Sequence, residues 1–183
     1  MNITILNGAP PGFDASFTTT CTNLHRVLTG HHSTTLFNLD EMHIKQCIGC
    51  WSCWWKTPGV CIHKDDLIPV MQSIVRADLL IFASPIRAGF TSSTLKTLQD
   101  RLIPLVHPYL ELVQGECHHR KRYPKYPDFA LLLQKEETTD QEDIMIITEI
   151  YRRLAVNFHS TLKHIWFTEN IQTSSVIHEL SHH

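Results

Sequence analysis

The sequence lacks the segments by which a protein is exported or crosses a membrane. Its 183 residues contain no apolar run of the roughly 18 residues that a membrane-spanning helix needs. The first ten residues, MNITILNGAP, have neither the basic region nor the long apolar core of an export signal. We therefore expect a protein of the reducing cytoplasm with no membrane partner.

Signatures of nucleoside-triphosphate and nucleic-acid binding are missing as well. The loop at residues 8–16, GAPPGFDAS, contains glycine and proline but no Walker motif. The formal net charge is −2, and the one dense basic run, HHRKR at residues 118–122, is short and has no interleaved aromatic residues on which bases could stack. We therefore expect no nucleic-acid partner.

Histidine is abundant, with 13 residues, but several of them come as adjacent pairs in polar surroundings. Such pairs are more often solvated than metal-bound, so we expect most of them at the surface. The pairs are His31 with His32, His118 with His119, and His182 with His183.

No internal repeat, low-complexity tract or linker divides the chain. An apolar fraction of 43% and a charged fraction of 19% match a globular protein. A chain of this length buries roughly 70% of its unfolded surface, enough for a core without disulfides. We predict one domain over residues 1–183.

Five short apolar runs predict buried strands, and between them apolar residues recur at helical spacing. Right-handed crossovers then place helices on both faces of a parallel sheet. The predicted fold is α/β, a three-layer, doubly wound, five-stranded parallel sheet. The strands are expected at residues 3–6, 34–39, 79–83, 129–133 and 165–168.

Local signals refine the helices between these strands. Thr139 with Glu142 has the spacing of a capping box, and Asp65 or Asp66 is placed to cap the helix before the third strand. Arg101, like Lys96 and Asp100, has the spacing of a surface contact. Residues 107–127 are rich in proline and basic residues, so we expect an irregular excursion that serves as a dimer contact or a lid.

Four of the six cysteines lie in one stretch, CIGCWSCWWKTPGVC, which is called the cysteine segment below (residues 47–61). In a reducing compartment such a group is better explained by a metal, cluster or redox role than by disulfides. The x2, x2, x7 spacing favours an iron-sulfur cluster over zinc, whose sites usually pair two C-x2-C knuckles across a longer loop. Free thiols without metal are the alternative. The candidate metal ligands are Cys47, Cys50, Cys53 and Cys61.

The other cysteines and the tryptophans of the segment have simpler explanations. Cys21 falls on the inner side of a predicted helix and is expected in the core, whereas Cys117 is expected at the surface. Trp51, Trp54 and Trp55 suit packing or an interface, with gating of a substrate path as the alternative.

Three unusual loops follow the first three strands, and the carboxyl ends of parallel strands meet at one edge of a sheet. They are residues 8–16, the cysteine segment and residues 84–93, SPIRAGFTSS. Hydroxyl groups crowd the start of the first helix, where a phosphate would be favoured, although Ser16 or Thr18 could instead be a simple N-cap. Together the loops suggest a flavin mononucleotide (FMN) site with a second electron centre.

The order and spacing of four segments resemble the flavodoxin-like NAD(P)H-dependent FMN oxidoreductases, and within them the iron-sulfur flavoproteins. The segments are CIGCWSC, C followed by IHKDDL, ADLLIFASPI and STLKTLQDR, between Cys47 and Arg101. The resemblance extends over nearly the whole chain. It implies a flavodoxin fold, bound FMN, a homodimer or homotetramer and, in iron-sulfur members, a 4Fe-4S cluster on Cys47, Cys50, Cys53 and Cys61.

The resemblance also assigns roles in FMN binding. The phosphate would be held by Ser16, Thr18 and Thr19, and the ring would be lined by Ser84, Pro85, Ile86, Arg87, Ala88 and Gly89. This chain differs from the family pattern at Pro11, where many relatives carry arginine, and at Arg87, where an aromatic residue is common. In the fourth loop, Glu136 and Glu137 would repel a phosphate.

The implied activity is electron transfer through FMN. NAD(P)H as co-substrate, or a reduced carrier such as a ferredoxin-like protein, would supply electrons that pass to a small acceptor such as a quinone. A cluster would relay single electrons. No general acid or base is evident in the sequence. A non-catalytic flavodoxin-like electron carrier and a zinc-stabilised interaction domain remain as alternatives, since a fold does not decide function.

Overall fold

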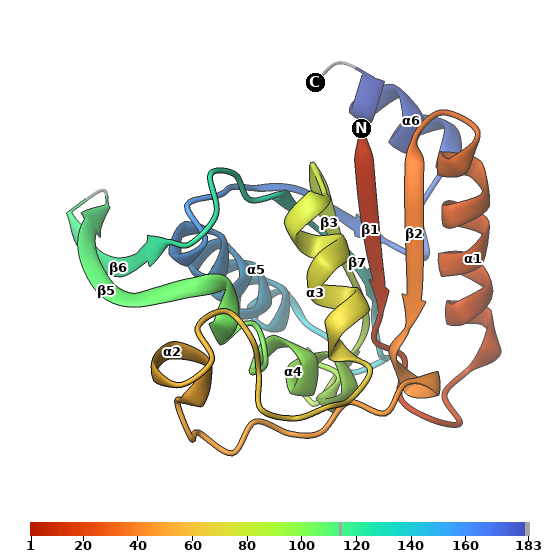
Figure 1. Cartoon of the computed structure of the whole chain (residues 1–183). Coiled ribbons are helices and arrows are strands. Elements are labelled where there is room, and N and C mark those ends of the chain that lie inside the picture. The colour runs from red at the N-terminus through yellow and green to blue at the C-terminus, as the bar shows by residue number, and fades with distance from the viewer. Residues whose placement is uncertain (114, 182–183) are drawn as a thin grey trace.

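Five parallel strands form the central sheet in the order β2-β1-β3-β7-β8. The computed structural model, drawn in Figure 1, describes residues 1–113 and 115–181. The order confirms the predicted doubly wound, flavodoxin-like sheet. Its strands are β1 (Asn2–Asn7), β2 (Ser33–Asn38), β3 (Leu79–Arg87), β7 (Asp128–Gln134) and β8 (Leu162–Phe167).

The two central strands owe their apolar sequences to burial on both faces. Every residue of β3 except Arg87 is buried, and in β7 only the two terminal residues are not. The edge strand β2 is only partly buried and has a more polar sequence. The continuous apolar runs of a parallel sheet therefore mark its centre.

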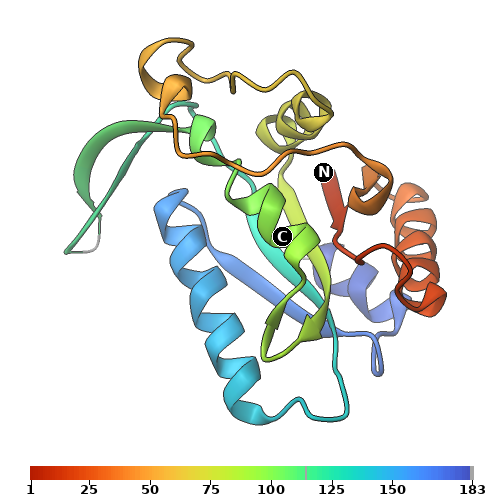
Figure 2. The ribbon, with the colours of Figure 1, turned by 90° about the horizontal axis from the view of Figure 1, so that it is seen from below.

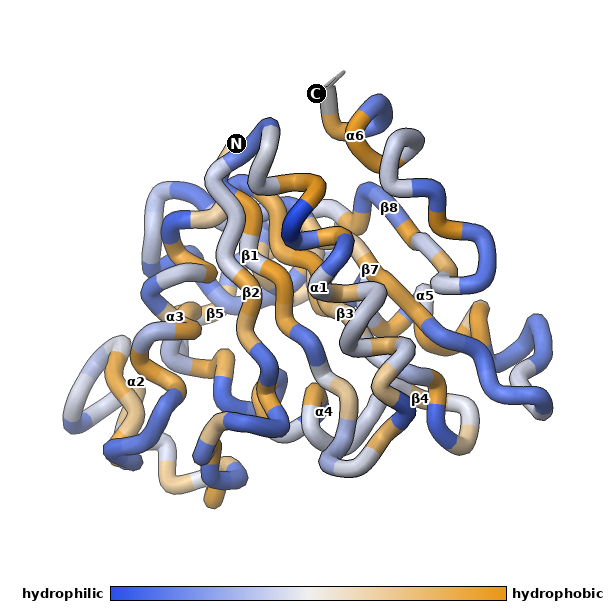
Figure 3. The backbone as a smooth tube through the Cα atoms, turned by 90° about the vertical axis from the view of Figure 1, so that its right-hand side faces the viewer, coloured by the Kyte–Doolittle hydropathy of each residue, from blue (hydrophilic) through white to orange (hydrophobic). Residues whose placement is uncertain are grey.

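Helices cover both faces of the sheet and give the predicted three layers. One face packs on α1 and α6, and the other on α3, α4 and α5. The apolar interior between these layers is visible along β1 and β7 in Figure 3. The helices are α1 (Ala15–Thr29), α3 (Leu67–Arg76), α4 (Ser93–Gln99), α5 (Gln141–Asn157) and α6 (Thr173–Ser181). None of the helices in the described part of the chain is long and apolar enough to cross a membrane.

Helix α5 begins with a capping box one residue later than predicted. Asp140 is the N-cap and accepts from the N–H of Asp143, whose side chain accepts from the N–H of Asp140. The hydroxyl of Thr139 instead accepts from the N–H of Glu136 in the preceding turn, at 2.9 Å. The prediction that Thr139 and Glu142 form the capping box was therefore wrong, because Asp140 and Asp143 form it.

Part of the expected excursion at residues 107–127 is regular. Strands β5 (Val106–Val113) and β6 (Glu116–Lys121) form an antiparallel hairpin that projects from the body, as Figure 1 shows, and is called the arm below. The prediction that this segment has no regular structure was wrong. The hairpin is stabilised by cross-strand contacts, such as that of Arg120 Nε with Glu111 Oε2 at 3.7 Å, and local composition does not predict such contacts.

The paired histidines do not all lie at the surface. His31 is exposed, whereas His118 is 7% exposed and its Nε2 lies 3.1 Å from Glu116 Oε2. His182 and His183 lie outside the described residues. As expected, Cys21 is buried and Cys117 is exposed.

Candidate functional site

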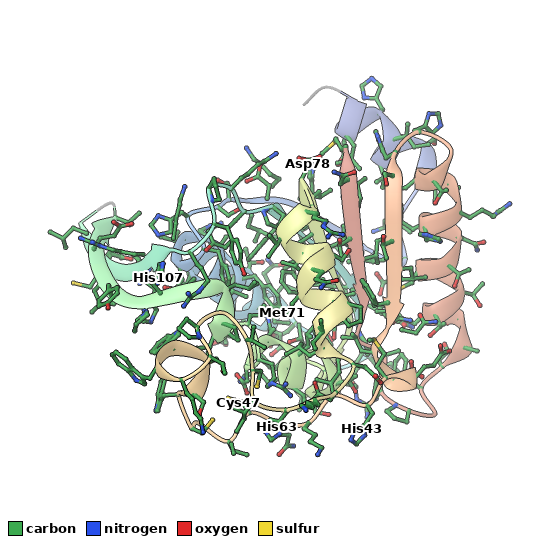
Figure 4. All side chains as sticks on the ribbon, viewed as in Figure 1. His43, Cys47, His63, Met71, Asp78 and His107 are labelled. Atoms are coloured by element: carbon green, nitrogen blue, oxygen red, sulfur yellow. The ribbon has the colours of Figure 1, made fainter. Side chains whose placement is uncertain are left out.

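The two ends of the cysteine segment are held together by backbone and carboxylate hydrogen bonds. The N–H of His43 donates to Asp66 Oδ2 at 2.7 Å, and the N–H of Asp66 donates to the carbonyl of His43 at 3.2 Å. The N–H of Lys45 donates to Asp65 Oδ2 at 3.0 Å. The chain between these points is thus a closed loop. Figure 4 shows Cys47 and His63, near its two ends, together at the lower edge of the molecule, where His43 also lies.

Arg101 completes this closure from inside the protein. Its side chain is 1% exposed and forms a bidentate ion pair with the fully buried carboxylate of Asp65, at 2.9 and 3.2 Å. Its Nη1 also donates to the carbonyl of Lys45 at 2.5 Å. The predicted surface position of Arg101 was wrong, because its guanidinium satisfies groups from both ends of the loop.

The pair is held in its charged form. Burial raises the pKa of Asp65, but hydrogen bonds from Arg101 and Lys45 and the charge of Arg101 lower it more, so the pKa lies below its ordinary value. Burial lowers the pKa of Arg101, and Asp65 together with the neighbouring sulfur of Cys61 raises it above its ordinary value. A signal for this burial existed in the sequence, since Arg101 follows Leu98 by three positions, the spacing of one helix face.

Trp54 fixes the middle of the cysteine segment against the root of the arm. It lies in the one-turn helix α2 (Ser52–Trp55), and its Nε1 is 3.1 Å from the carbonyl oxygens of Ile103 and Val106. Its ring contacts those of Trp51 and His119 at centroid distances of 4.8 and 4.9 Å. The packing role predicted for Trp54 fits these contacts, whereas Trp55 is 69% exposed.

The candidate ligands Cys47, Cys50, Cys53 and Cys61 line one small cavity, together with His63 and Ile103. All four are free thiols. Burial raises the pKa of Cys53, and so do the nearby sulfurs, that of Cys61 most. The pKa of Cys50 is lowered, because the backbone N–H and then the hydroxyl of Ser52 hydrogen-bond to its sulfur. The structure thus brings the four cysteines to one place.

The donor set of this cavity suits an iron-sulfur cluster. Thiolates are the ligands of such clusters, and four unpaired thiols share the cavity without a disulfide. Among residues 1–113 and 115–181, no three His, Cys, Asp or Glu side chains are gathered as a metal-ion site would require. The thiols therefore share a cavity but are not arranged around one common point.

A larger cavity, which the sequence did not predict, lies on the other side of Cys61. Its volume is about 460 Å³, a size typical of small-molecule sites. It runs along α3, where Met71 and Val75 line it, and reaches Tyr123. Because Cys61 lines both cavities, a small apolar molecule could approach the cysteine segment from the α3 side.

The loops after β1 and β3 are joined directly to each other. The N–H of Gly8 donates to the carbonyl of Ala83 at 2.8 Å, and the hydroxyl of Ser92, the N-cap of α4, donates to the carbonyl of Gly8. A Cβ on Gly8 would lie 2.7 Å from the Cβ of Leu95, so only glycine fits. The two loops expected to hold a flavin are therefore neighbours.

The predicted phosphate residues Ser16, Thr18 and Thr19 lie within the first five residues of α1, but the N-cap is Asp14 rather than one of them. Asp14 accepts the N–H of Ser16 at 2.9 Å and also its hydroxyl, and these bonds lower the pKa of Asp14. Thr18 accepts from the side chain of Asn7 at 3.3 Å, and Thr19 donates to the carbonyl of Ala15 at 2.8 Å. A carboxylate thus already takes the donors at this helix start.

The predicted ring-lining residues are divided between core and surface. Ser84, Pro85 and Ile86 are buried in β3, whereas Arg87 and Ala88 are exposed. Ala88 and Gly89 have φ values of 48° and 73°, and they form a tight turn into the short strand β4 (Phe90–Thr91). A Cβ on Gly89 would lie 2.5 Å from Asp143 Oδ1. The segment is thus a strand and a turn rather than a loop.

Arg87 connects this turn to the first and fourth loops. Its Nε lies 3.0 Å from Glu136 Oε1, and its guanidinium carbon lies 5.8 Å from the ring centre of Phe13. The ion pair places a positive charge on the acidic fourth loop. The repulsion expected from Glu136 toward a phosphate is therefore offset in part.

The cysteine segment and the flavin loops lie on different sides of α4. Figure 2, seen from below, shows α4 between the cysteine segment and the β3–β4 turn, and Figure 1 shows the same separation from the loop before α1. The structure therefore gathers the cysteines in one place and joins the loops after β1 and β3 in another.

Sequence comparisons relate the chain to flavin reductases. The family model described as NADPH-dependent FMN reductase matches residues 1–116. An iron-sulfur flavoprotein of Methanocaldococcus jannaschii is 38% identical over 79 residues, which cover 43% of this chain and 39% of that protein. An iron-sulfur flavoprotein of Archaeoglobus fulgidus is 31% identical over 70 residues, covering 38% and 33%. The matched region is thus well under half of each relative.

Solved structures with low sequence identity share the fold. An FMN-dependent NADH-azoreductase from Bacillus anthracis, in complex with FMN, has a TM-score of 0.64 at 12% identity, covering 98% of this chain and 93% of that one. An NAD(P)H:quinone oxidoreductase from Methanothermobacter marburgensis has a TM-score of 0.60 at 15% identity, covering 98% and 90%. These likenesses establish the flavodoxin-like architecture.

Replacing Asp65 should loosen the cysteine segment and reduce the acid sensitivity of folding. Asp65→Asn leaves the buried charge of Arg101 without its partner, so we expect the free energy of unfolding at neutral pH to fall by about 3–5 kcal/mol. In the wild type the pKa of Asp65 is depressed in the fold. Its stabilisation is therefore complete above the ordinary value of 3.8 and is lost as the pH falls below it. The variant should therefore lose less unfolding free energy than the wild type when the pH falls below this value.

Urea unfolding at a series of pH values tests this, with Asp78→Asn as the control. Asp78 pairs with Lys125 at the surface, with exposures of 32% and 70%, so its loss should cost about 1 kcal/mol or less. Equal losses in the two variants would contradict a special role for the buried pair.

Proposed function

The chain belongs to the NADPH-dependent FMN reductase family, whose model matches residues 1–116, and from this we propose that it is an FMN-dependent oxidoreductase. The family match carries the proposal, because the matched residues include both loops expected at the flavin and the whole cysteine segment. Electrons would come from NAD(P)H or from a reduced carrier such as a ferredoxin-like protein. They would pass to a small acceptor such as a quinone. Six free cysteines are consistent with a reducing cytoplasm.

We infer that FMN is held by the loops after β1 and β3. Ser16, Thr18 and Thr19 would bind the phosphate, and the residues from Ser84 to Gly89 would face the ring. When bound, FMN supplies the redox step. The carboxylate of Asp14 supports the phosphate position, because an anionic oxygen already accepts the N–H and the hydroxyl of Ser16. A phosphate would take these donors in its place.

Arg87 has two proposed roles in this site. Its ion pair with Glu136 reduces the negative charge that a dinucleotide phosphate would meet at the fourth loop, which favours NAD(P)H as co-substrate. Its contact with Phe13 joins the first loop to the β3–β4 turn. The arginine stands where relatives commonly carry an aromatic residue, and it would link the first loop, the β3–β4 turn and the fourth loop through these two contacts.

The cysteine segment would hold a 4Fe-4S cluster through Cys47, Cys50, Cys53 and Cys61. Support comes from the cavity that the four thiols share and from relatives called iron-sulfur flavoproteins. Such a cluster transfers single electrons and so suits a one-electron carrier as the donor.

Purification without oxygen tests the function directly. We expect flavin absorption bands together with broad iron-sulfur absorbance, bound FMN, and steady-state oxidation of NADH or NADPH when a quinone is added. Cys53→Ser should remove iron and sulfide but leave FMN bound, because α4 separates the two regions. A colourless protein that contains zinc and oxidises neither nucleotide would contradict the proposal and support the zinc-stabilised interaction domain.

A comparison of the affinities for FMN and for riboflavin tests the proposed position of the FMN phosphate. Asp14→Asn removes a negative charge at the start of α1, so we expect it to tighten binding of FMN while leaving binding of riboflavin, which has no phosphate, unchanged. Quenching of flavin fluorescence on titration with protein measures both affinities. Equal effects on the two flavins, or none on either, would place the phosphate elsewhere.

The arm supports a homodimer or homotetramer. Three apolar side chains of β5, Tyr109, Leu110 and Leu112, are 60%, 56% and 75% exposed. An apolar group of this kind on a projecting hairpin is typical of a protein interface.

Leu112→Glu places a charge on this surface, so we expect it to shift the protein toward monomer in sedimentation equilibrium. Met145→Glu is the control, because Met145 is an apolar residue, 57% exposed, on α5 rather than on the arm. Unchanged assembly in Leu112→Glu would show that the arm is not the contact.

A further inference from the structure

The cavity of about 460 Å³ beside α3, called the α3 cavity below, is lined by none of the residues proposed to bind FMN. Its walls are mostly apolar. Helix α3 packs Val70 and Ile74 into the core, and Met71 and Val75 on the neighbouring face line the cavity. Leu105 lines it as well. A concave, apolar space of this size is typical of a site for a small molecule.

Hydrogen bonds outside the α3 cavity hold part of its wall in place. The hydroxyl of Tyr126 donates to the carbonyl of Leu105 and accepts from the N–H groups of Arg122 and Tyr123, at 2.8 and 3.3 Å. Nη2 of Arg122 donates to the carbonyl of Val106 at 3.2 Å. Leu105 and Tyr123, which both line the cavity, are therefore fixed without any ligand, as expected of a preformed site.

One polar atom of this wall has no partner. Nε2 of His63 is buried, and it makes no hydrogen bond within residues 1–113 and 115–181. His63 lines the α3 cavity together with Cys61. A buried polar atom without a partner needs an explanation, and an oxygen atom of a ligand would provide one. A neutral imidazole nitrogen can donate to a carbonyl oxygen or accept from a hydroxyl, according to its tautomer.

The lining favours an aromatic ligand with an oxygen at its edge. Met71 is adaptable and its sulfur makes favourable contacts with aromatic rings, and Tyr123 provides an aromatic surface. Gln72 and Arg76 also line the cavity, but both are exposed on α3 and can stay in contact with water. A quinone meets these requirements, because it is a flat apolar ring with carbonyl oxygens, and its reduced form presents hydroxyl groups to the same nitrogen.

We propose that the α3 cavity binds the quinone acceptor, with one ring oxygen at Nε2 of His63 and the ring against Met71 and Val75. The inference rests on the proposed oxidoreductase, which supplies the electrons. A hydride from NAD(P)H and a proton from water convert the quinone to the hydroquinone and NAD(P)H to NAD(P)⁺. Because Cys61 lines both this cavity and that of the four thiols, the acceptor would be bound beside the cysteine segment rather than at the flavin loops.

Equilibrium dialysis of duroquinone against the FMN-loaded, anaerobically purified protein tests the site. This quinone is methylated at every open ring position, so the free thiols have no position to attack. Val75→Phe fills the α3 cavity, and we expect it to weaken binding roughly 10- to 100-fold. Val27→Phe is the matched control and should bind normally, because Val27 is also half-buried on a helix but lies on α1, which covers the opposite face of the sheet.

Two variants of His63 test the hydrogen bond without adding bulk to the cavity, and they keep the test valid if Val75→Phe does not fold. His63→Phe keeps a ring but loses Nε2, so duroquinone should bind roughly 2- to 10-fold more weakly, the effect of one hydrogen bond. His63→Gln places an amide near the position of Nε2 and should recover most of the affinity. The KM for duroquinone during NAD(P)H oxidation should rise by the same factors. Circular dichroism checks the fold of each variant.

Unchanged affinity in both Val75→Phe and His63→Phe would overturn the proposal, and so would equal losses in Val75→Phe and Val27→Phe. Release of bound FMN by duroquinone would also overturn it, because the quinone would then occupy the flavin site. Loss of iron from His63→Phe with unchanged affinity for duroquinone would assign Nε2 to the cavity of the four thiols instead.

The oxidoreductase is judged separately on the wild-type protein. FMN content and NAD(P)H oxidation with ferricyanide, an anion too hydrophilic for an apolar cavity, measure it without the quinone. An active flavoprotein that does not bind duroquinone would refute the role of the α3 cavity and leave the proposed oxidoreductase standing.

Discussion

The buried ion pair of Arg101 and Asp65 is the contact on which the cysteine segment depends. Helix α2 is a single turn with no buried residue, so the segment has little core of its own. Its ends are held where Arg101 and Asp65 meet Lys45, and its middle is held by Trp54 at the root of the arm. A buried carboxylate or guanidinium is strongly destabilising when its partner is lost. The pair of Asp65 and Arg101 therefore keeps the two ends of the cysteine segment together.

The flavin loops are organised differently, by backbone contacts at the end of the sheet. Gly8 meets Ala83 through a main-chain hydrogen bond and meets Ser92 through its carbonyl, so the strand order itself brings the loops together. Charges then modify this common arrangement. Asp14 places a carboxylate at the start of α1, and the positive charge of Arg87 offsets the negative charge of Glu136 in the fourth loop. The architecture is that of the family, whereas the charge pattern at the loops is a feature of this chain.

Several features were predictable because local sequence decides them. The continuous apolar run of residues 79–83 needs cover on both faces, and only a central parallel strand has it. Other features were missed because they depend on contacts distant in sequence. The arm is stabilised by pairing between β5 and β6, and Arg101 is buried because Lys45 and Asp65 supply its partners from 56 and 36 positions away. The capping box of α5 was misplaced by one residue, since Thr139 and Asp140 are both competent caps and the preceding turn takes Thr139.

Local pattern was thus enough for the five buried strands, the single cysteine segment and the crowding of hydroxyl groups at the first helix, because each is a property of neighbouring residues. Only the folded chain decides that the four thiols share one cavity, that the guanidinium of Arg101 is buried against Asp65, and that α4 separates this cavity from the flavin loops. Distances between side chains from different elements follow from how helices pack on the sheet. Spacing along the chain does not encode that packing.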